Sequence, residues 1–264
     1  PLIIGWDFAG TVDALGANVS DVVVGEAVFG HLAFTNTQKQ GSFAQFVTID
    51  REEVAVKPAG VPDHIAAAAA TCATTSLQSI RDLGQLPPDG KVLIIGAGGG
   101  VGSIAVGIAK RLGAHVTAVC STKDVARVQS FGADVVIDRK KADALAATAT
   151  YDVVFDTPAV HSYGACVQTL RPGGAYVTTL PNLGLMTGMV RALLSSKRCY
   201  FVQVASKRVD LELIGRWLEG DETSAVTAPL TVPMDSRHPV AELDAAIARY
   251  GDPARSGRVV VDVA

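Results

Sequence analysis

A segment near the middle of the chain, residues 91–114, constrains the fold more than any other. An apolar run at 92–95 leads into a glycine cluster and then into a helical stripe of apolar residues, Ile104, Ile108 and Leu112. This order predicts a buried strand, a tight turn and a helix whose amino terminus faces the turn. Backbone N–H groups and the positive end of the helix dipole would then converge on one spot, which suits a pyrophosphate.

The spacing of the glycines departs from the commonest dinucleotide pattern. Gly-x-Gly-x-x-Gly does not fit, whereas Gly-x-x-Gly-x-x-Gly fits at Gly96, Gly99 and Gly102, with Gly100 and Val101 inside the turn. A glycine cluster alone would also suit a plain structural turn. The strand before it and the amphipathic helix after it favour dinucleotide binding.

The end of the next strand indicates which dinucleotide would bind. That strand, residues 115–119, is followed by Cys120-Ser121-Thr122-Lys123, and no acidic residue lies between 115 and 123. In NAD-binding folds an acidic residue here holds the ribose 2′-hydroxyl. A serine hydroxyl and a lysine charge instead suit a 2′-phosphate, with Arg139 as a further cation, so the predicted cofactor is NADPH. The competing interpretations are a solvated lysine at a helix start and a capping role for Asp124, three residues after Ser121.

Length, charge and cysteine usage exclude several classes of protein. The chain has 264 residues, which suits two domains, and its net charge of −3 gives no reason to expect nucleic acid as a partner. No apolar run is long enough to span a membrane, and no signal peptide is visible. The four cysteines are far apart, which argues against a structural zinc lobe and fits a reducing compartment, so a cytoplasmic protein is expected.

The pattern of apolar residues changes along the chain. Short apolar runs between glycines predict a small β-barrel or sandwich up to about residue 60, with strands at 21–24 and 44–48. Helices are expected at 65–73 and 75–83. Strands and helices then alternate, which predicts a parallel sheet covered on both faces. The expected strands are 91–95, 116–119, 135–137, 153–155, 175–179, 200–204, 231–234 and 258–263, and the expected helices 101–112, 123–131, 140–147, 162–170, 190–194, 211–218 and 240–250.

Several segments, taken in order, match a known family. They are GWDFAGTV at 5–12, GSFAQFV at 41–47, ATTSLQ at 73–78, VLIIGAGGGVG at 92–102, LGAHVTAVCS at 112–121, FGADVVID at 131–138, YDVVFD at 151–156 and SGRVV at 256–260. With them the chain resembles the medium-chain dehydrogenase/reductase superfamily, in its zinc-free quinone oxidoreductase branch, similar to zeta-crystallin.

The resemblance implies an α/β fold, in which a Rossmann-type doubly wound parallel sheet is inserted in a GroES-like β-barrel substrate domain. The implied boundaries are 1–72 and 206–264 for the substrate domain and 73–205 for the NADPH-binding domain. The family's N-terminal segment has no counterpart here, so the substrate domain is expected to be incomplete. Implied cofactor contacts, besides the glycine turn, Ser121, Lys123 and Arg139, are Thr75, Thr179, Leu180, Phe201, Val202 and Gln203.

The resemblance also has departures that bear on metal binding. Members with a catalytic zinc carry His-Glu where this chain has Trp6-Asp7, and a cysteine at the position that aligns with Thr71. No metal site is therefore expected, and Asp7 is interpreted as a buried carboxylate paired for structure. The five histidines show no metal-ligand spacing, and most are expected in loops or at the surface.

Two functions from different classes follow. The first is a zinc-independent, NADPH-dependent reductase that passes hydride to a quinone or an α,β-unsaturated carbonyl compound, with no catalytic side chain assigned. The second is an NADPH-binding protein with little turnover, acting as a structural or regulatory partner. A homodimer is expected in either case, through the apolar strand at 200–204 at the edge of the nucleotide-binding sheet.

Overall fold

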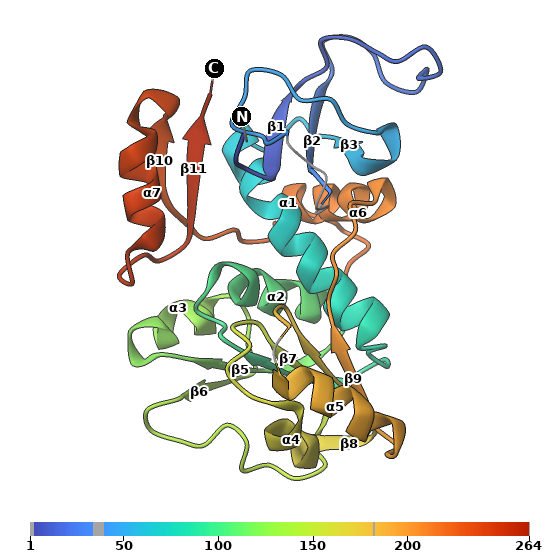
Figure 1. Cartoon of the computed structure of the whole chain (residues 1–264), viewed down its shortest axis with the longest axis vertical. Coiled ribbons are helices and arrows are strands. Elements are labelled where there is room, and N and C mark those ends of the chain that lie inside the picture. The colour runs from blue at the N-terminus through green and yellow to red at the C-terminus, as the bar shows by residue number, and fades with distance from the viewer. Residues whose placement is uncertain (1–2, 34–39, 182, 264) are drawn as a thin grey trace. The chain divides into compact units, whose positions relative to one another are not determined.

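The computed structural model describes residues 3–33, 40–181 and 183–263 (Figure 1). The chain divides into two compact units. Unit 1 comprises residues 1–74, 204–222 and 227–264, and unit 2 comprises residues 75–203 and 223–226. The division falls inside the helix α1 (Asp63–Leu77), whose alanine-rich sequence favours helix. No described helix is long and apolar enough to cross a bilayer.

Unit 2 is built on a six-stranded sheet in the order β6-β5-β4-β7-β8-β9, with every neighbouring pair parallel. The strands are β4 (Lys91–Ile95), β5 (His115–Cys120), β6 (Val135–Asp138), β7 (Tyr151–Asp156), β8 (Leu170–Thr178) and β9 (Arg198–Phe201). The expected doubly wound parallel sheet is thereby confirmed.

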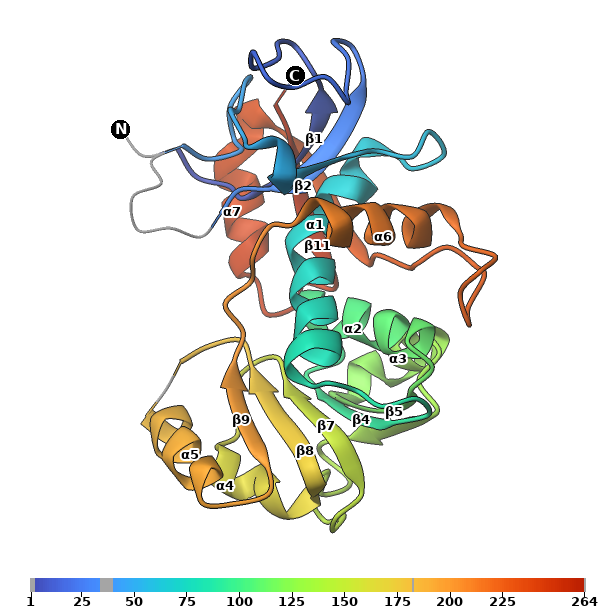
Figure 2. The ribbon, with the colours of Figure 1, turned by 90° about the vertical axis from the view of Figure 1, so that its right-hand side faces the viewer.

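Helices cover both faces of this sheet, as Figures 1 and 2 show. The π-helical segment η2 (Gln78–Leu83), α2 (Gly100–Arg111), η3 (Thr122–Asp124) and α3 (Val125–Ser130) belong to one side, and α4 (Tyr163–Cys166), η4 (Val167–Thr169) and α5 (Leu183–Leu193) to the other. The strands are apolar throughout because successive side chains enter different cores. Ile94 packs with Ala105 and Ala109 of α2, whereas Leu93 packs with Tyr163 and Leu185.

Unit 1 contains the β-rich amino-terminal residues and the carboxy-terminal helices. Its antiparallel sheet consists of β1 (Asp7–Thr11), β2 (Ala27–His31) and β3 (Val54–Val56), preceded by η1 (Arg51–Glu53). The helix α6 (Arg208–Glu219) packs on β3. A parallel pair, β10 (Met234–Pro239) and β11 (Arg258–Asp262), carries η5 (Val240–Glu242) and α7 (Leu243–Gly251).

Several predicted elements were wrong. Residues 21–24 form turns and not a strand, because Val23 and Val24 are exposed and Gly25 reverses the chain with a φ of +89°. Residues 44–48 are irregular, and Phe46 is exposed. The expected helix at 140–147 is a series of turns in which the Asp138 and Asp143 carboxylates accept the Lys140 and Leu145 N–H groups. Such side-chain acceptors compete with helical hydrogen bonds.

Other elements exist but with shifted bounds. The helix expected at 162–170 is a single short turn, α4, followed by η4, since β8 already begins at Leu170. The helix expected at 190–194 is the longer α5. The strand expected at 231–234 begins only at Met234, and β9 lies at 198–201 and not at 200–204.

Candidate nucleotide-binding site

The order of strands in unit 2 creates one point where the chain changes direction. From β4 the chain continues outward through β5 and β6, and then returns to pair β7 on the other side of β4. In open α/β sheets, ligands bind outside the carboxyl ends of the strands at such a switch point. Here Ile95 and Asp156 are register partners at those two strand ends, followed by Gly96 and Thr157.

The turn after β4 leaves no space for a side chain at several of its glycines. Gly96 has a φ of +83°, and a Cβ there would lie 2.7 Å from Thr157 Oγ1 and from Pro158 Cδ. A Cβ on Gly102 would lie 2.3 Å from the Gly96 carbonyl oxygen, so this glycine lets α2 approach the strand. At Gly99 the nearest atom would be the same oxygen at 3.3 Å. Gly99 therefore has more room within the protein, and the helix start beside it stays open to a ligand.

The amino terminus of α2 supplies the donors of the site. Gly99 is its N-cap residue and has extended backbone angles, and no side chain caps the helix there. The N–H groups of Gly100, Val101 and Gly102, in the first turn, have no acceptor within the helix. Together with the helix dipole they suit an anion such as a pyrophosphate.

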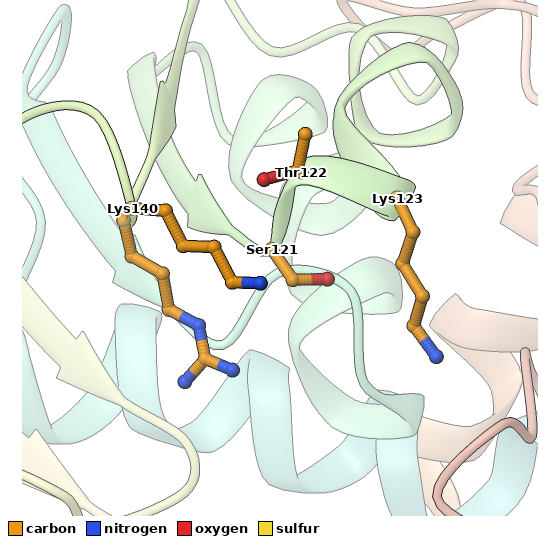
Figure 3. A pocket seen from close by; sticks show the side chains of 5 residues that line it. Ser121, Thr122, Lys123 and Lys140 are labelled. Carbon is orange, nitrogen blue, oxygen red and sulfur yellow. The ribbon is translucent and has the colours of Figure 1, made fainter.

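A cationic cavity of about 500 Å³ lies at the carboxyl ends of β5 and β6 (Figure 3). Its lining residues are Ser121, Thr122, Lys123, Arg139 and Lys140. Figure 3 shows the Ser121 side chain between those of Lys123 and Lys140. Three cations, two hydroxyls and no acidic lining residue suit a phosphate group.

The structure thus brings together Ser121, Lys123 and Arg139, three of the residues expected to bind NADPH, and adds Lys140. Lys140 follows β6 in a turn that its own N–H makes to Asp138 Oδ1 at 3.0 Å. The sequence analysis placed this lysine in a helix, so its proximity to Ser121 was missed. The available signal was its position directly after Arg139, at a strand end next to β5.

Asp124 does not play the capping role that the sequence suggested. The Ser121 hydroxyl donates to Asp124 Oδ2 at 2.6 Å, and no side-chain capping bond is made by Ser121. Arg127 donates to Asp124 Oδ1 at 2.6 Å and to the Gly98 carbonyl at 2.9 Å, which anchors the glycine turn. Burial opposes ionisation of Asp124, but the Ser121 hydroxyl and the Arg127 guanidinium outweigh it and hold its pKa below the usual range.

The remaining expected cofactor contacts lie in three elements. Thr179 and Leu180 follow β8, and the Thr179 hydroxyl donates to the Thr157 carbonyl at 2.7 Å, whereas Leu180 is exposed. Phe201 ends β9, with Val202 buried and Gln203 exposed directly after it. The parallel sheet therefore places these residues at the same edge as the glycine turn. Thr75 lies in α1, almost fully buried.

In unit 1, Asp7, which follows Trp6, forms an ion pair with Arg258. Asp7 Oδ1 accepts the Thr71 N–H at 2.7 Å, and Asp7 Oδ2 accepts a 2.7 Å hydrogen bond from Arg258. The interpretation of Asp7 as a structural carboxylate agrees with these contacts. Within the described ranges, no cluster of three or more His, Cys, Asp or Glu side chains is arranged to hold a metal ion.

The histidines and cysteines differ in how well the sequence predicted them. His31 is fully buried at the end of β2, and burial lowers its pKa, although the nearby Asp7 carboxylate acts in the opposite direction. His31 is thus an exception to the expectation that most histidines lie in loops or at the surface. All four cysteines are free and buried, as small apolar residues would be, and burial raises the pKa of Cys166 to about 12.

Comparisons with known proteins agree with this architecture. Family models match residues 1–59, as an alcohol dehydrogenase GroES-like domain, and residues 100–201, as a zinc-binding dehydrogenase. The structure of a quinone oxidoreductase from Coxiella burnetii superposes with a TM-score of 0.83 at 22% identity, covering 100% of this chain and 80% of that one. The GroES-like part of the expected fold is thereby confirmed.

Curated relatives are oxidoreductases. The trans-enoyl reductase pgmF of Aspergillus terreus is 32% identical over 247 residues, 86% of this chain and 68% of that protein. The mitochondrial NAD(P)H oxidoreductase RTN4IP1 of Homo sapiens is 32% identical over 212 residues, 72% of this chain and 52% of that protein. A chloroplast envelope quinone oxidoreductase homolog of Arabidopsis thaliana is 27% identical over 276 residues, 99% of this chain and 80% of that protein.

Proposed function

Because the chain belongs to the medium-chain dehydrogenase/reductase superfamily, in its quinone oxidoreductase-like branch, we propose that it is an NADPH-dependent reductase of quinones or α,β-unsaturated carbonyl compounds. The observation that carries the choice of cofactor is the cavity lined by Lys123, Arg139 and Lys140. It lies at the end of β5, where the adenosine ribose of a dinucleotide is held in such folds, and three cations there favour a 2′-phosphate over a free hydroxyl.

The proposed cofactor site follows the carboxyl edge of the sheet in unit 2. The pyrophosphate would lie on the N–H groups at the start of α2, and the 2′-phosphate in the cationic cavity. Thr179, Leu180, Phe201, Val202 and Gln203 would stand near the nicotinamide, and Thr75 would complete the site. Residues 73–205 would form this NADPH-binding domain, and residues 1–72 and 206–264 the substrate domain.

The proposed class of hydride acceptor follows from the side chains in unit 1 that stand at zinc-ligand positions of other family members. Two positions that hold zinc in other members carry Trp6 and Thr71, and Asp7 is already bonded to Arg258 and to the Thr71 N–H. Neither an indole nor a threonine hydroxyl is a usual zinc ligand. In zinc-dependent members, alcohol oxidation uses the metal to make the hydroxyl proton acidic, whereas a quinone or an enone delocalises the incoming charge itself. Bound NADPH would supply the hydride, and this chain's residues would orient it.

The decisive test compares rates of NADPH oxidation with a naphthoquinone and a short enone against rates of NADP⁺ reduction with simple alcohols. Gly99→Val serves as the inactive control, since a side chain at the start of α2 blocks the pyrophosphate, and within the protein its Cβ would meet only the Gly96 carbonyl oxygen, at 3.3 Å. Faster alcohol oxidation would overturn the acceptor class. Tight NADPH binding without turnover on any acceptor would favour the alternative, a nucleotide-binding protein with a structural or regulatory role.

Metal dependence is tested separately. Elemental analysis of the purified, untagged protein should give well under one zinc per chain, and activity should survive chelation. A stoichiometric zinc whose removal abolishes turnover would refute the zinc-independent mechanism.

We also propose a homodimer in a reducing compartment such as the cytoplasm. Support for the dimer is that β9 is an outer strand of the sheet, next to the apolar helix α5. Support for the compartment is that all four cysteines are free thiols.

A further inference from the structure

The segment after β7, residues 157–161, lies directly against the glycine turn. The Thr157 N–H and hydroxyl both reach the Ile95 carbonyl, at 3.2 and 2.9 Å. Thr157 Oγ1 and Pro158 Cδ occupy the space where a side chain on Gly96 would stand. Since β4 and β7 flank the switch point of the sheet, this segment is the second wall of the nucleotide crevice.

This wall is not a relaxed loop. Ala159, in its middle, has a φ of +53°, a left-handed conformation that costs an alanine free energy. The segment is also too short to contain regular structure of its own. Something outside it must therefore hold it in this shape.

Asp156, the last residue of β7, provides that hold. Its side chain is fully buried, and its Oδ2 accepts the His161 N–H at 2.7 Å while Oδ1 accepts the Val160 N–H at 3.3 Å. The carboxyl group thus bonds the far end of the wall, on the other side of the left-handed Ala159. Removing it would leave the Val160 and His161 N–H groups without this acceptor.

Tyr176 of the neighbouring strand β8 completes the arrangement. Its hydroxyl lies 2.6 Å from the His161 carbonyl and 3.2 Å from Asp156 Oδ2. A tyrosine hydroxyl has a single proton, and a carbonyl has none to give, so the shorter contact takes that proton. The hydroxyl thus links the Asp156 carboxyl group to the far end of the wall.

The surroundings of Asp156 disfavour its charged form. Burial raises its pKa, against the smaller opposing effects of the Val160 and His161 N–H groups, the His161 side chain and Tyr176. The Cys166 thiol of α4 is the other titratable group that faces it, and its own pKa is raised by burial and by Asp156.

We propose that Asp156 and Tyr176 form a positioning pair that holds residues 157–161 as the second wall of the nucleotide crevice. The inference rests on the proposed function in so far as the crevice must bind a nicotinamide nucleotide. The pair acts through the wall and through Gly96, and touches neither the cofactor nor the substrate.

The experiment measures the Kd of NADPH by fluorescence titration, together with kcat and KM and with hydrogen exchange of the Val160 and His161 amides in the cofactor-free protein. Asp156→Ala should speed exchange at both amides and raise Kd roughly tenfold, the size expected for losing hydrogen bonds to a buried group. At saturating NADPH, kcat should change little. Asp156→Asn keeps one of the two acceptor oxygens and should lose less affinity than Asp156→Ala.

A matched control is available on the same strand. Asp152, near the amino end of β7, accepts the Lys91 N–H at 2.7 Å and pairs with Arg171 at 3.1 Å. It is a structural carboxylate at the opposite edge of the sheet. Asp152→Ala should lower Tm and leave the Kd of NADPH unchanged.

Tyr176→Phe keeps the ring, which packs edge-on against Tyr163, and removes the hydroxyl. It should raise Kd about threefold, as loss of a neutral hydrogen bond would. If Asp156→Ala does not fold, Tyr176→Phe alone tests the inference. Unchanged Kd and unchanged exchange in Tyr176→Phe, and in Asp156→Ala where that variant folds, would overturn the inference, with the proposed function intact. A parent protein that binds neither NADPH nor NADH would overturn both.

Discussion

Arg258 of β11 donates a 2.7 Å hydrogen bond to the Asp7 carboxylate of β1, although the two residues are 251 positions apart in the sequence. The other oxygen of the same carboxylate accepts the Thr71 N–H of α1. One side chain therefore ties three distant segments of unit 1 together. About a fifth of each charged side chain is exposed, 16% for Asp7 and 21% for Arg258, so the pair is only partly screened by solvent.

Arg258→Ala should destabilise the protein by about 2 kcal/mol, because it leaves a largely buried carboxylate without its cation. The measurement is urea unfolding at neutral pH. Arg237→Ala is the matched control, since Arg237 pairs with Asp262 in the same β10–β11 unit and both side chains are 41% exposed or more. That exposed pair should contribute less than about 1 kcal/mol. Equal losses in the two variants would show that Asp7 and Arg258 have no special structural role.

Lys123→Ala and Lys140→Ala should each weaken NADPH binding about tenfold and leave NADH binding nearly unchanged. Each variant removes a positive charge that would contact the 2′-phosphate, a group that NADH lacks. Isothermal titration with both nucleotides gives the two affinities. Lys141→Ala is the control, because Lys141 is the next residue along, its side chain is 75% exposed, and it does not line the cavity. If the parent protein binds NADH as tightly as NADPH, the choice of cofactor is wrong.

Asp235 should make unit 1 sensitive to acid. Arg249 contacts both of its oxygens, at 2.6 and 2.7 Å, and these hydrogen bonds, helped by the Ser256 N–H, hold the pKa of Asp235 well below its usual range. A carboxyl with a depressed folded-state pKa stabilises the fold above its unfolded pKa, about 4, and loses that contribution as the pH falls further. Asp235→Asn should therefore lower stability by about 1–2 kcal/mol at pH 7. The difference in stability between this variant and the parent protein, measured by thermal unfolding, should shrink steadily below pH 4. A difference that stays constant with pH would contradict the prediction.

The nucleotide-binding sheet was predictable because its strands are continuous apolar runs that are buried on both faces, and glycines mark the turn at their ends. Elements whose form depends on tertiary contacts were not. The extended α5 contains Gly188, a poor helix former, yet a Cβ there would lie 2.5 Å from Tyr163 Cβ, so the glycine is required for close packing.

The same distinction applies to the site. Ser121 and Lys123 follow a strand and could be found from the order of the sequence. Lys140 depends on which strand ends are neighbours, and the pair of Asp156 and Tyr176 depends on the register of β7 and β8, where Asp156 opposes Thr178. Neither relation is visible before the sheet is assembled.

The helix α5 has an apolar face that no described residue covers. Met186, Met189 and Val190 are exposed on it, and Leu193 and Leu194 are exposed by 84% and 90%. Met186, Met189, Val190 and Leu193 recur at spacings of three and four residues, which places them on one side of the helix, and Leu194 follows directly after its end. A contiguous cluster of exposed apolar side chains of this kind usually marks an interaction surface.

This face and the neighbouring outer strand β9 are where we expect the second copy of the chain to bind. Val202 is a poor site for a test, because it is 6% exposed and its N–H bonds the Thr178 carbonyl, so a charge there would disturb the sheet itself. The double variant Leu193→Glu with Leu194→Glu avoids this problem, since both side chains point away from the unit. It should convert a dimer into a monomer in light scattering without lowering Tm.

Val135→Glu is the control, because Val135 is 44% exposed on β6, the outer strand at the opposite edge of the same sheet. A parent protein that stays monomeric at high concentration, or a dimer that Val135→Glu disrupts and the α5 variant does not, would place the interface elsewhere.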